Sequence, residues 1–388
     1  MRTVRVTVPA TSANLGPGFD SLGLALGLHN TVELSEIDAG LAFHFRGEGA
    51  DSLPRDAGNL VVRAAREVFR VAGRTPSGLR VGLNSAIPLA SGLGSSAAAL
   101  LGGIVAANAL IDHPLSGEEL LELAIDLEGH PDNVTAAFLG GLVISSYEGG
   151  HLVYKTVTVQ PLQAVVVLPD VTLSTGAARD ALPEEVPLKD AALNVGRAAL
   201  VVQALVEGDY KLLGEAMRDR LHEPYRQKLI PGYDEAIKAA RSKGAAAVAI
   251  SGAGPSLLAL AEDEHEWIAR AMAEAFEKAT GKTARTWILP IDTQGVALTE
   301  MATEMPLTRP RKKAPAPEPE KPAPAEPKKE EAPAPEAKAA PASPVIPASG
   351  KPLSLGEAAE LVRQRAAAER DAAKPASEKP ESVQPDDA

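Results

Sequence analysis

The stretch PLASGLGSSAAA occupies residues 88–99 and joins a proline, two glycines one residue apart, two serines and the alanines that open a long apolar run. Glycines at this spacing free backbone N–H groups to approach a bulky anion. A helix that starts in the alanines would add partial positive charge from its N-terminus. The stretch therefore predicts a loop that holds phosphate, and the plainer interpretation is a glycine turn before a buried helix.

Two other phosphate-binding loops fit this stretch less well. Gly92, Gly94 and Ala97 match the spacing of a dinucleotide-binding turn, and Asp112 lies in the range expected for a ribose ligand. The context differs, because Pro88 stands where the preceding strand should enter the turn and a helical segment follows Asp112. A P-loop requires a Gly-Lys-Ser/Thr ending, and the stretch has no lysine. We therefore expect a phosphate-binding loop of another design.

The composition differs between a first region that can fold and a second, proline-rich region. Of the 388 residues 45% are hydrophobic, and the 32 prolines crowd beyond residue 305. The first part is long enough to bury one or two sizeable cores. Cysteine is missing from the chain, which excludes disulfides, thiolate zinc sites and a cysteine nucleophile.

Charge and hydropathy argue against two kinds of partner. The net charge is −12 and no basic stripe with interleaved aromatic residues occurs, so we expect no nucleic-acid partner. No run of about 18 uncharged apolar residues would span a bilayer. The N-terminus alternates Val4, Val6 and Val8 with polar residues, which is typical of a strand and not of a signal peptide. We expect a cytoplasmic protein with no membrane partner.

Up to about residue 302, strand-like runs alternate with helix-like runs, which predicts a mixed α/β (α+β) fold. Ser116 and Glu119 form a capping box and Gly129 supplies a stop, so we expect a helix over 117–128. The stretch YEGGHLVYKTVTVQ is typical of a hairpin and lies between two halves of this region. We therefore predict one domain over 1–155 and a second over 156–302.

Beyond residue 302 the prediction changes. Residues 303–350 are rich in Pro, Ala, Glu and Lys, and proline at this density with few large apolar residues predicts a disordered linker. Within 351–388, Ser354 and Glu357 form another capping box, which predicts a short helix over 354–374. Either this helix is solvated and marginal, or it docks on a partner that the sequence does not identify.

Two further motifs accompany the glycine loop: PATSANLGPGFDSLGLAL at 9–26 and SGAGPS at 251–256. Together the three resemble the signature motifs of the GHMP kinases, which phosphorylate small molecules. The first motif resembles the homoserine kinase family specifically, and the similarity continues through EGHPDNVTAAFLGG, STGAARDALP, EPYRQKLIPGY and IDTQGV, over roughly residues 1–300. The resemblance implies a two-domain GHMP kinase fold with an N-terminal ATP-binding domain and a C-terminal ferredoxin-like domain.

The resemblance implies that ATP binds at the glycine loop, with Mg²⁺ held by the Ser96 hydroxyl and the Glu128 carboxylate. A glutamate in the last turn of a helix faces the negative end of the helix dipole, which favours a nearby cation; an exposed, solvated side chain is the alternative. Asn59 matches an adenine-pocket position and can also cap the helix that follows it. The implied ATP-binding residues are Asn59, Pro88, Leu89, Ala90, Ser91, Gly92, Leu93, Gly94, Ser95 and Ser96.

The phosphate acceptor that the resemblance implies is L-homoserine. Arg179 and Arg226 would bind its carboxylate, because the planar guanidinium fork suits that group. Asn14 and Asp20 would surround its amino group and side-chain oxygen. The implied acceptor-site residues are Asn14, Asp20, His130, Asn133, Thr175, Arg179, Arg226 and Gly254, and the implied catalytic residues are Ser96, Glu128, Asn133 and Arg179.

The stretch HPDN at 130–133 leaves the proton acceptor open. Sister kinases place an aspartate here that can act as general base, whereas the homoserine kinase pattern faces the hydroxyl with Asn133, which cannot take a proton. Direct proton transfer to the γ-phosphate is compatible with a loose transition state, so Asn133 would orient the hydroxyl. His130 is either a substrate-site residue or a histidine that caps a turn.

The implied activity is ATP-dependent phosphorylation of the side-chain hydroxyl of L-homoserine to O-phospho-L-homoserine, a step of threonine biosynthesis. Two alternatives stay open at this point: a related GHMP kinase that acts on another hydroxy acid, and a non-catalytic scaffold that recruits partners through its tail. The resemblance also implies a homodimer.

Overall fold

The larger of two β-sheets is built around the N-terminal strand. A computed structural model of the chain describes residues 2–301, and its strands form one sheet of seven and one of four. The larger sheet has the order β11-β1-β2-β4-β3, with β5 on β2 and β6 on β5. Its strands are β1 (Thr3–Ala13), β2 (Leu22–Glu36), β3 (Gly40–Gly47), β4 (Gly78–Ser85), β5 (Leu142–Glu148), β6 (His151–Val157) and β11 (Ala297–Met301).

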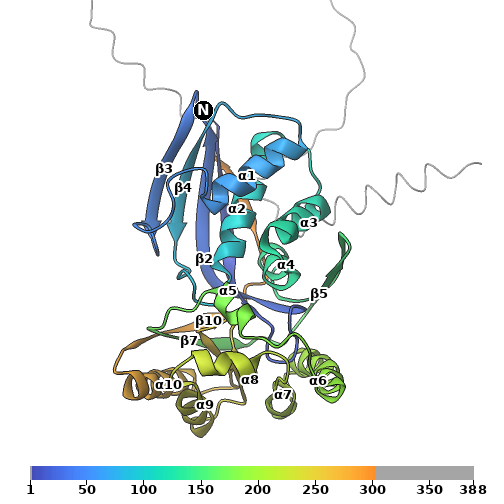
Figure 1. Cartoon of the computed structure of the whole chain (residues 1–388), viewed down its shortest axis with the longest axis vertical. Coiled ribbons are helices and arrows are strands. Elements are labelled where there is room, and N and C mark those ends of the chain that lie inside the picture. The colour runs from blue at the N-terminus through green and yellow to red at the C-terminus, as the bar shows by residue number, and fades with distance from the viewer. Residues whose placement is uncertain (1, 302–388) are drawn as a thin grey trace, which may run out of the picture. The chain divides into compact units, whose positions relative to one another are not determined.

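Four helices cover one face of this sheet (Figure 1). They are α1 (Leu60–Val71), α2 (Ser95–Leu110), α3 (Gly117–Glu128) and α4 (Pro131–Leu139). Helix α2 contacts β1, β2, α1, α3 and α4, and it is apolar all round because it lies at the centre of this layer. Val4, Val6 and Val8 point into the same core, as the alternation predicted.

The smaller sheet contains β7 (Gln163–Pro169), β8 (Ala247–Ile250), β9 (Leu257–Leu260) and β10 (Ala284–Pro290). Its strand order, β10-β7-β9-β8, places the first strand of the four between the fourth and the third, which is the ferredoxin-like arrangement. Helices α9 (Tyr233–Ser242) and α10 (His265–Thr280) pack on one face. The other helices of the described region are α5 (Thr175–Asp180), α6 (Leu188–Glu207), α7 (Tyr210–Ala216) and α8 (Glu223–Arg226), followed by a 3₁₀ turn over Gln227–Leu229.

Strand β7 links the two hydrophobic cores. Val165 and Val167 face the core beneath α9 and α10, whereas Ala164 and Val166 face the core that continues into the larger sheet. Successive side chains of a strand point to opposite faces, so an unbroken apolar run is what a strand buried on both sides requires.

Several local predictions are confirmed. Helix α3 spans the predicted 117–128, with the Ser116–Glu119 capping box formed and Gly129 in the left-handed conformation at φ 92°. The predicted hairpin is β5–β6, which turns at Gly149 and Gly150 between the paired residues Glu148 and His151.

The chain returns to the larger sheet at its described end. Strand β11 falls within the range 156–302 predicted for the second domain, yet it pairs antiparallel with β1, Ala297 opposite Thr7. The domain limits therefore stay a prediction. The linker expected over 303–350 and the tail over 351–388 with its helix over 354–374 lie outside the described residues. Within residues 2–301, no helix has the length and hydropathy that a bilayer crossing needs.

Candidate active site

Three sequence motifs that are far apart in the chain meet around one cavity of about 400 Å³. The backbone N–H of Thr11 donates to the carbonyl of Leu93, and the N–H of Gly252 donates to the carbonyl of Ala13. The Ser251 hydroxyl donates to the carbonyl of Gly92 at 2.8 Å. These bonds join the 9–26 motif, the glycine loop and the 251–256 motif into one wall.

The glycine loop has no room for side chains at its two glycines. Gly92 has φ +81°, and a Cβ there would lie 2.2 Å from the Ser251 carbonyl oxygen. Gly94 has φ +70°, and a Cβ there would lie 2.1 Å from the Thr11 hydroxyl oxygen. Gly94 is also the N-cap of α2, where no side chain caps the helix and no acidic residue stands in the first turn. The first N–H groups of α2 are thus left to a ligand anion.

Ser96 and Glu128 offer a pair of oxygen ligands beside this helix end. The Ser96 hydroxyl donates to Oε1 of Glu128 at 2.5 Å. Burial raises the pKa of the Glu128 carboxyl, and the Ser96 hydrogen bond opposes that change. Glu128 ends α3, whose last turn has no basic residue. Oxygen ligands at the negative end of a helix fit a hard divalent cation that shares its remaining positions with phosphate and water.

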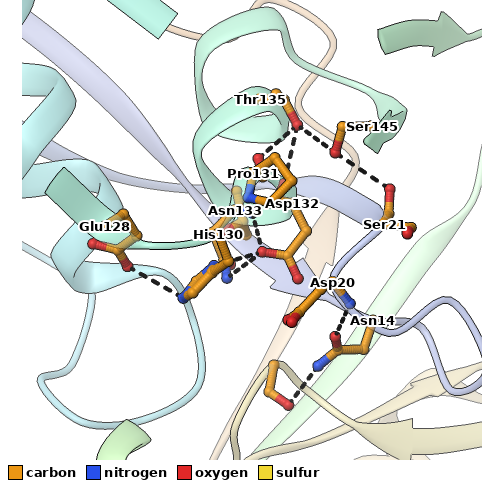
Figure 2. Close-up of polar contacts among 12 residues, drawn as sticks. Asn14, Asp20, Ser21, Glu128, His130, Pro131, Asp132, Asn133, Thr135 and Ser145 are labelled. Atoms are coloured by element: carbon orange, nitrogen blue, oxygen red, sulfur yellow. Dashed lines mark hydrogen bonds and ion pairs between the residues drawn. The ribbon is translucent and has the colours of Figure 1, made fainter. Parts of the chain in front are cut away.

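His130 lies between two carboxylates at the start of α4 (Figure 2). Its Nδ1 is 2.8 Å from Oδ1 of Asp132, and its Nε2 is 3.9 Å from Oε1 of Glu128. Burial alone would lower the pKa of His130, but the hydrogen bond with Asp132 and the charges of Asp132 and Glu128 raise it. His130 is the N-cap residue of α4, but its side chain makes no capping hydrogen bond to that helix. The residue lines the cavity instead.

The amide of Asn133 has a fixed orientation. The Thr11 hydroxyl donates to Oδ1 of Asn133 at 2.6 Å, and Nδ2 of Asn133 donates to Oδ1 of Asp132 at 3.3 Å. The amide oxygen therefore already accepts a hydrogen bond, and the nitrogen keeps a second proton for a ligand in the cavity.

Charged groups of both signs line the other end of the cavity. Arg179 donates two hydrogen bonds to Asp20, from Nη1 to Oδ2 at 3.0 Å and from Nη2 to Oδ1 at 2.9 Å. Asn14 accepts from the backbone N–H of Asp20 at 3.0 Å and donates to the Gly252 carbonyl at 2.8 Å. Arg226 is buried and donates to the carbonyls of Ala178 and Gly252.

The structure brings most of the predicted site residues to this cavity. Asn59 lines it and also caps α1, because its Oδ1 accepts from the Val61 N–H at 3.0 Å. The predicted residues that line the cavity are Asn14, Asp20, Asn59, Leu89, Ala90, Ser91, Gly92, Gly94, Ser95, Ser96, Glu128, His130, Asn133, Thr175, Arg179 and Arg226.

Three predicted residues do not line the cavity. Pro88 accepts the Ser91 hydroxyl through its carbonyl, and Leu93 is buried in the larger core. Gly254 faces Ile230 and Ile250 of the smaller core.

Sequence reasoning missed Asp132 and Gly252, both of which line the cavity. Asp132 lies inside the quoted HPDN stretch, and an acidic residue directly after a proline, as in the first turn of a helix, was the signal available. The missed apolar residues that line the cavity include Leu53, Pro54, Leu60, Val61, Leu83 and Ala99.

Comparisons with known proteins identify the family of this chain. The family of GHMP kinase N-terminal domains matches residues 59–141, and that of GHMP kinase C-terminal domains matches 201–278. Homoserine kinase of Carboxydothermus hydrogenoformans is 45% identical over 273 residues, 70% of this chain and 90% of that protein. Homoserine kinase of Moorella thermoacetica is 46% identical over 274 residues, 70% of this chain and 92% of that protein.

Solved structures give the same result. The crystal structure of homoserine kinase from Cytophaga hutchinsonii superposes with a TM-score of 0.70 at 32% identity, covering 76% of this chain and 97% of that one. The mevalonate kinase of L. major, at 19% identity and a TM-score of 0.56, shares the fold. The two-domain fold is that of a GHMP small-molecule kinase. Within that superfamily, the chain belongs to the homoserine kinase family.

Proposed function

We propose that this protein transfers the γ-phosphoryl group of ATP to the side-chain hydroxyl of L-homoserine, which gives O-phospho-L-homoserine and ADP. The observation that carries the proposal is one cavity in which the Gly92–Gly94 loop lies beside Asp20, Arg179 and Arg226. A phosphate-binding loop next to groups of both charge signs suits a nucleotide and a zwitterionic amino acid. The reaction belongs to threonine biosynthesis.

The residues of the glycine loop would position the triphosphate. Phosphoryl transfer runs through a loose transition state, so the protein contributes mainly alignment and charge neutralisation. Backbone N–H groups at the head of α2 supply fixed donors that need no rearrangement during the reaction. Apolar residues around Asn59 would hold the adenine.

Ser96 and Glu128 would hold Mg²⁺. Both are oxygen ligands. Among residues 2–301, the cationic partner given by the geometry for the Glu128 carboxylate is His130, whose Nε2 lies 3.9 Å away and so beyond hydrogen-bond distance. When bound there, the ion would neutralise charge on the phosphate oxygens.

At the acceptor end, Asp20 would bind the ammonium group, and Arg179 and Arg226 the carboxylate. Asn133 would donate its free Nδ2 proton to the hydroxyl oxygen and so direct the hydroxyl proton away from itself. An amide cannot take that proton. The hydroxyl proton would therefore pass directly to an oxygen of the γ-phosphoryl group that is transferred.

A panel of acceptors tests this proposal. Purified protein with ATP and Mg²⁺ is offered L-homoserine, L-threonine, mevalonate, shikimate or galactose, and ADP release is followed with a no-acceptor control. We expect L-homoserine to give the highest kcat/KM by far, and a phosphate ester in the ³¹P spectrum. A higher kcat/KM for another acceptor would favour the related-kinase alternative, and no turnover with any acceptor would favour the scaffold. The homodimer and the cytoplasmic location stay predictions.

A further inference from the structure

Arg226 is a buried cation whose hydrogen-bond partners are neutral, while the charges of Arg179, Asp20, Asp219 and Asp132 act on it without forming an ion pair. It is the largest fully buried side chain of the described region and still reaches the cavity wall. Its guanidinium donates to the carbonyl oxygens of Ala178 and Gly252 and to Nδ1 of His222, each at 3.2 Å. No Asp or Glu within residues 2–301 forms an ion pair with it, whereas Arg179 is paired with Asp20. Arg226 therefore has no direct ion pair among the described residues, and its guanidinium is available to pair with a ligand carboxylate.

The imidazole ring of His222 is one of the hydrogen-bond partners of this guanidinium. The ring is buried, and its Nε2 lies 2.9 Å from the carbonyl oxygen of Gly16. Because a carbonyl only accepts, Nε2 carries a proton, and a neutral ring then offers the lone pair of Nδ1 to Arg226. Gly16 belongs to the 9–26 motif, so one imidazole connects that motif with the arginine.

Burial favours the neutral ring of His222. Burial lowers the pKa of His222, whereas the charge of Asp219 raises it; the charge of Arg226 lowers it further, and the hydrogen bond with Gly16 and the charge of Asp20 oppose this. The Asp219 carboxylate is 3.9 Å from Nε2, but it accepts the backbone N–H groups of His222 and Glu223, each at 2.7 Å. It therefore fixes the turn before α8 and leaves the ring without a strong anionic partner.

The Phe19 side chain packs against both His222 and Arg226. Its ring stacks on the His222 ring with centroids 5.2 Å apart and an interplanar angle of 25°. The same ring lies 5.3 Å from the Arg226 guanidinium carbon. Three flat groups thus pack together, and they restrict the guanidinium without neutralising it.

We infer that His222 is a positioning residue, which as a neutral acceptor holds the Arg226 guanidinium uncompensated and in place, so that the cavity selects acceptors that bear a carboxylate. A carboxylate in place of the imidazole would hold the arginine equally well and cancel its charge. The inference rests on the proposed function, because it assigns to Arg226 the carboxylate of the acceptor.

Two matched substitutions separate the hydrogen bonds of the ring. In His222→Asn the amide oxygen stands near the position of Nδ1 and keeps an acceptor for Arg226. In His222→Gln the amide nitrogen stands near the position of Nε2 and keeps the donor to Gly16, but the acceptor is lost. The exposed His151, changed to Gln, is the control. Thermal unfolding of each variant shows whether it folds.

The readout is the preference for a carboxylate, measured as kcat/KM for L-homoserine over kcat/KM for 2-amino-1,4-butanediol, in which a hydroxymethyl group replaces the carboxylate. We expect His222→Gln to lower this ratio about tenfold to one-hundredfold, with KM for ATP nearly unchanged. His222→Asn should lower it much less. A ratio in His222→Gln equal to the wild-type ratio would overturn the inference.

A measurement on the unaltered protein keeps the inference testable if neither variant folds. Long-range ¹H–¹⁵N spectra of the histidine rings report charge and tautomer. We expect His222 to stay neutral with its proton on Nε2 between pH 6 and 8; a charged ring or a proton on Nδ1 would overturn the inference. If the wild type ignores L-homoserine, the proposed function fails, and this spectrum still decides whether Arg226 has a neutral partner.

Discussion

The guanidinium of Arg179 and the carboxylate of Asp20 are paired through two hydrogen bonds of 2.9 and 3.0 Å, although the residues are 159 positions apart. The proposed function assigns them the two charged groups on the α-carbon of the acceptor, the carboxylate to Arg179 and the ammonium to Asp20. Without an acceptor the two groups neutralise one another. The pair thus keeps both charges at the cavity until a zwitterion with the same two charges competes for them.

Asp20→Asn tests this role. The amide can still accept from Arg179 but has no charge for an ammonium group, so we expect KM for L-homoserine to rise about tenfold to one-hundredfold while KM for ATP changes little. Steady-state kinetics with each substrate varied gives both constants. Glu274→Gln, which removes the exposed pair with Arg270, is the control and should change neither. Equal rises in both constants would assign Asp20 to the general shape of the cavity.

Glu128→Gln tests the proposed Mg²⁺ site. The amide oxygen can still accept the Ser96 hydroxyl, so the fold should be retained, while the charge that attracts a cation is lost. We expect kcat to fall by roughly one-hundredfold or more, and half-maximal activity to need more Mg²⁺. A Mg²⁺ titration at saturating ATP and L-homoserine measures both effects. The exposed Glu118 at the other end of α3, changed to Gln, is the control. An unaltered Mg²⁺ dependence would remove Glu128 from the metal site.

Asn133→Asp distinguishes orientation from base catalysis. If Asn133 only orients the hydroxyl through Nδ2, an aspartate loses the donor and adds a second charge beside Asp132, so kcat should fall about one-hundredfold. If the reaction lacks only a base, the same variant should match or exceed the wild type. Single-turnover rates decide between the two.

Thr11→Val tests whether the orientation of the Asn133 amide matters. The variant removes the donor to Oδ1 of Asn133 and should lower the single-turnover rate severalfold, since the amide is then free to turn.

The local parts of the fold could be predicted because their causes are neighbours in the chain. Helix α3 begins at a capping box and ends at Gly129, and both signals lie within a few residues of the ends that they define. The glycine loop was predicted for the same reason. Helix α2 begins at Ser95, two residues before Ala97, the first of the alanines in which we expected it to start, because Gly94 in the left-handed conformation serves as its N-cap.

The long-range parts could not be predicted from the residues alone. Nothing in the pattern of β11 shows that it pairs with β1, and nothing near Arg179 shows that Asp20 is its partner. The SGAGPS motif contains two glycines, and only the fold shows that Gly252 lines the cavity while Gly254 faces the smaller core. Strand pairing, ion-pair partners and the residues that line the cavity all depend on packing between segments that are far apart in the sequence.

Glu223 gives a prediction about stability that is independent of catalysis. The side chain is buried and accepts the Ile250 N–H through Oε1 at 2.7 Å. Burial raises its pKa from the ordinary 4.5 to about 8. Since the carboxyl has the higher pKa in the folded protein, the folded state binds more protons than the unfolded state between these values. The free energy of unfolding therefore falls as the pH rises, by about 1.4 kcal/mol per pH unit from this group.

Glu223→Gln keeps an oxygen acceptor for Ile250 and removes the titration. Between pH 6 and pH 8 we expect the wild type to lose roughly 2 to 3 kcal/mol relative to this variant. Urea unfolding at both pH values measures the difference, and Glu235→Gln, on the exposed side of α9, is the control that should follow the wild type. Parallel changes in wild type and Glu223→Gln would mean that Glu223 has the same pKa folded and unfolded. In that case the nearby Arg226 would stabilise a buried carboxylate, and its charge would no longer be reserved for a ligand.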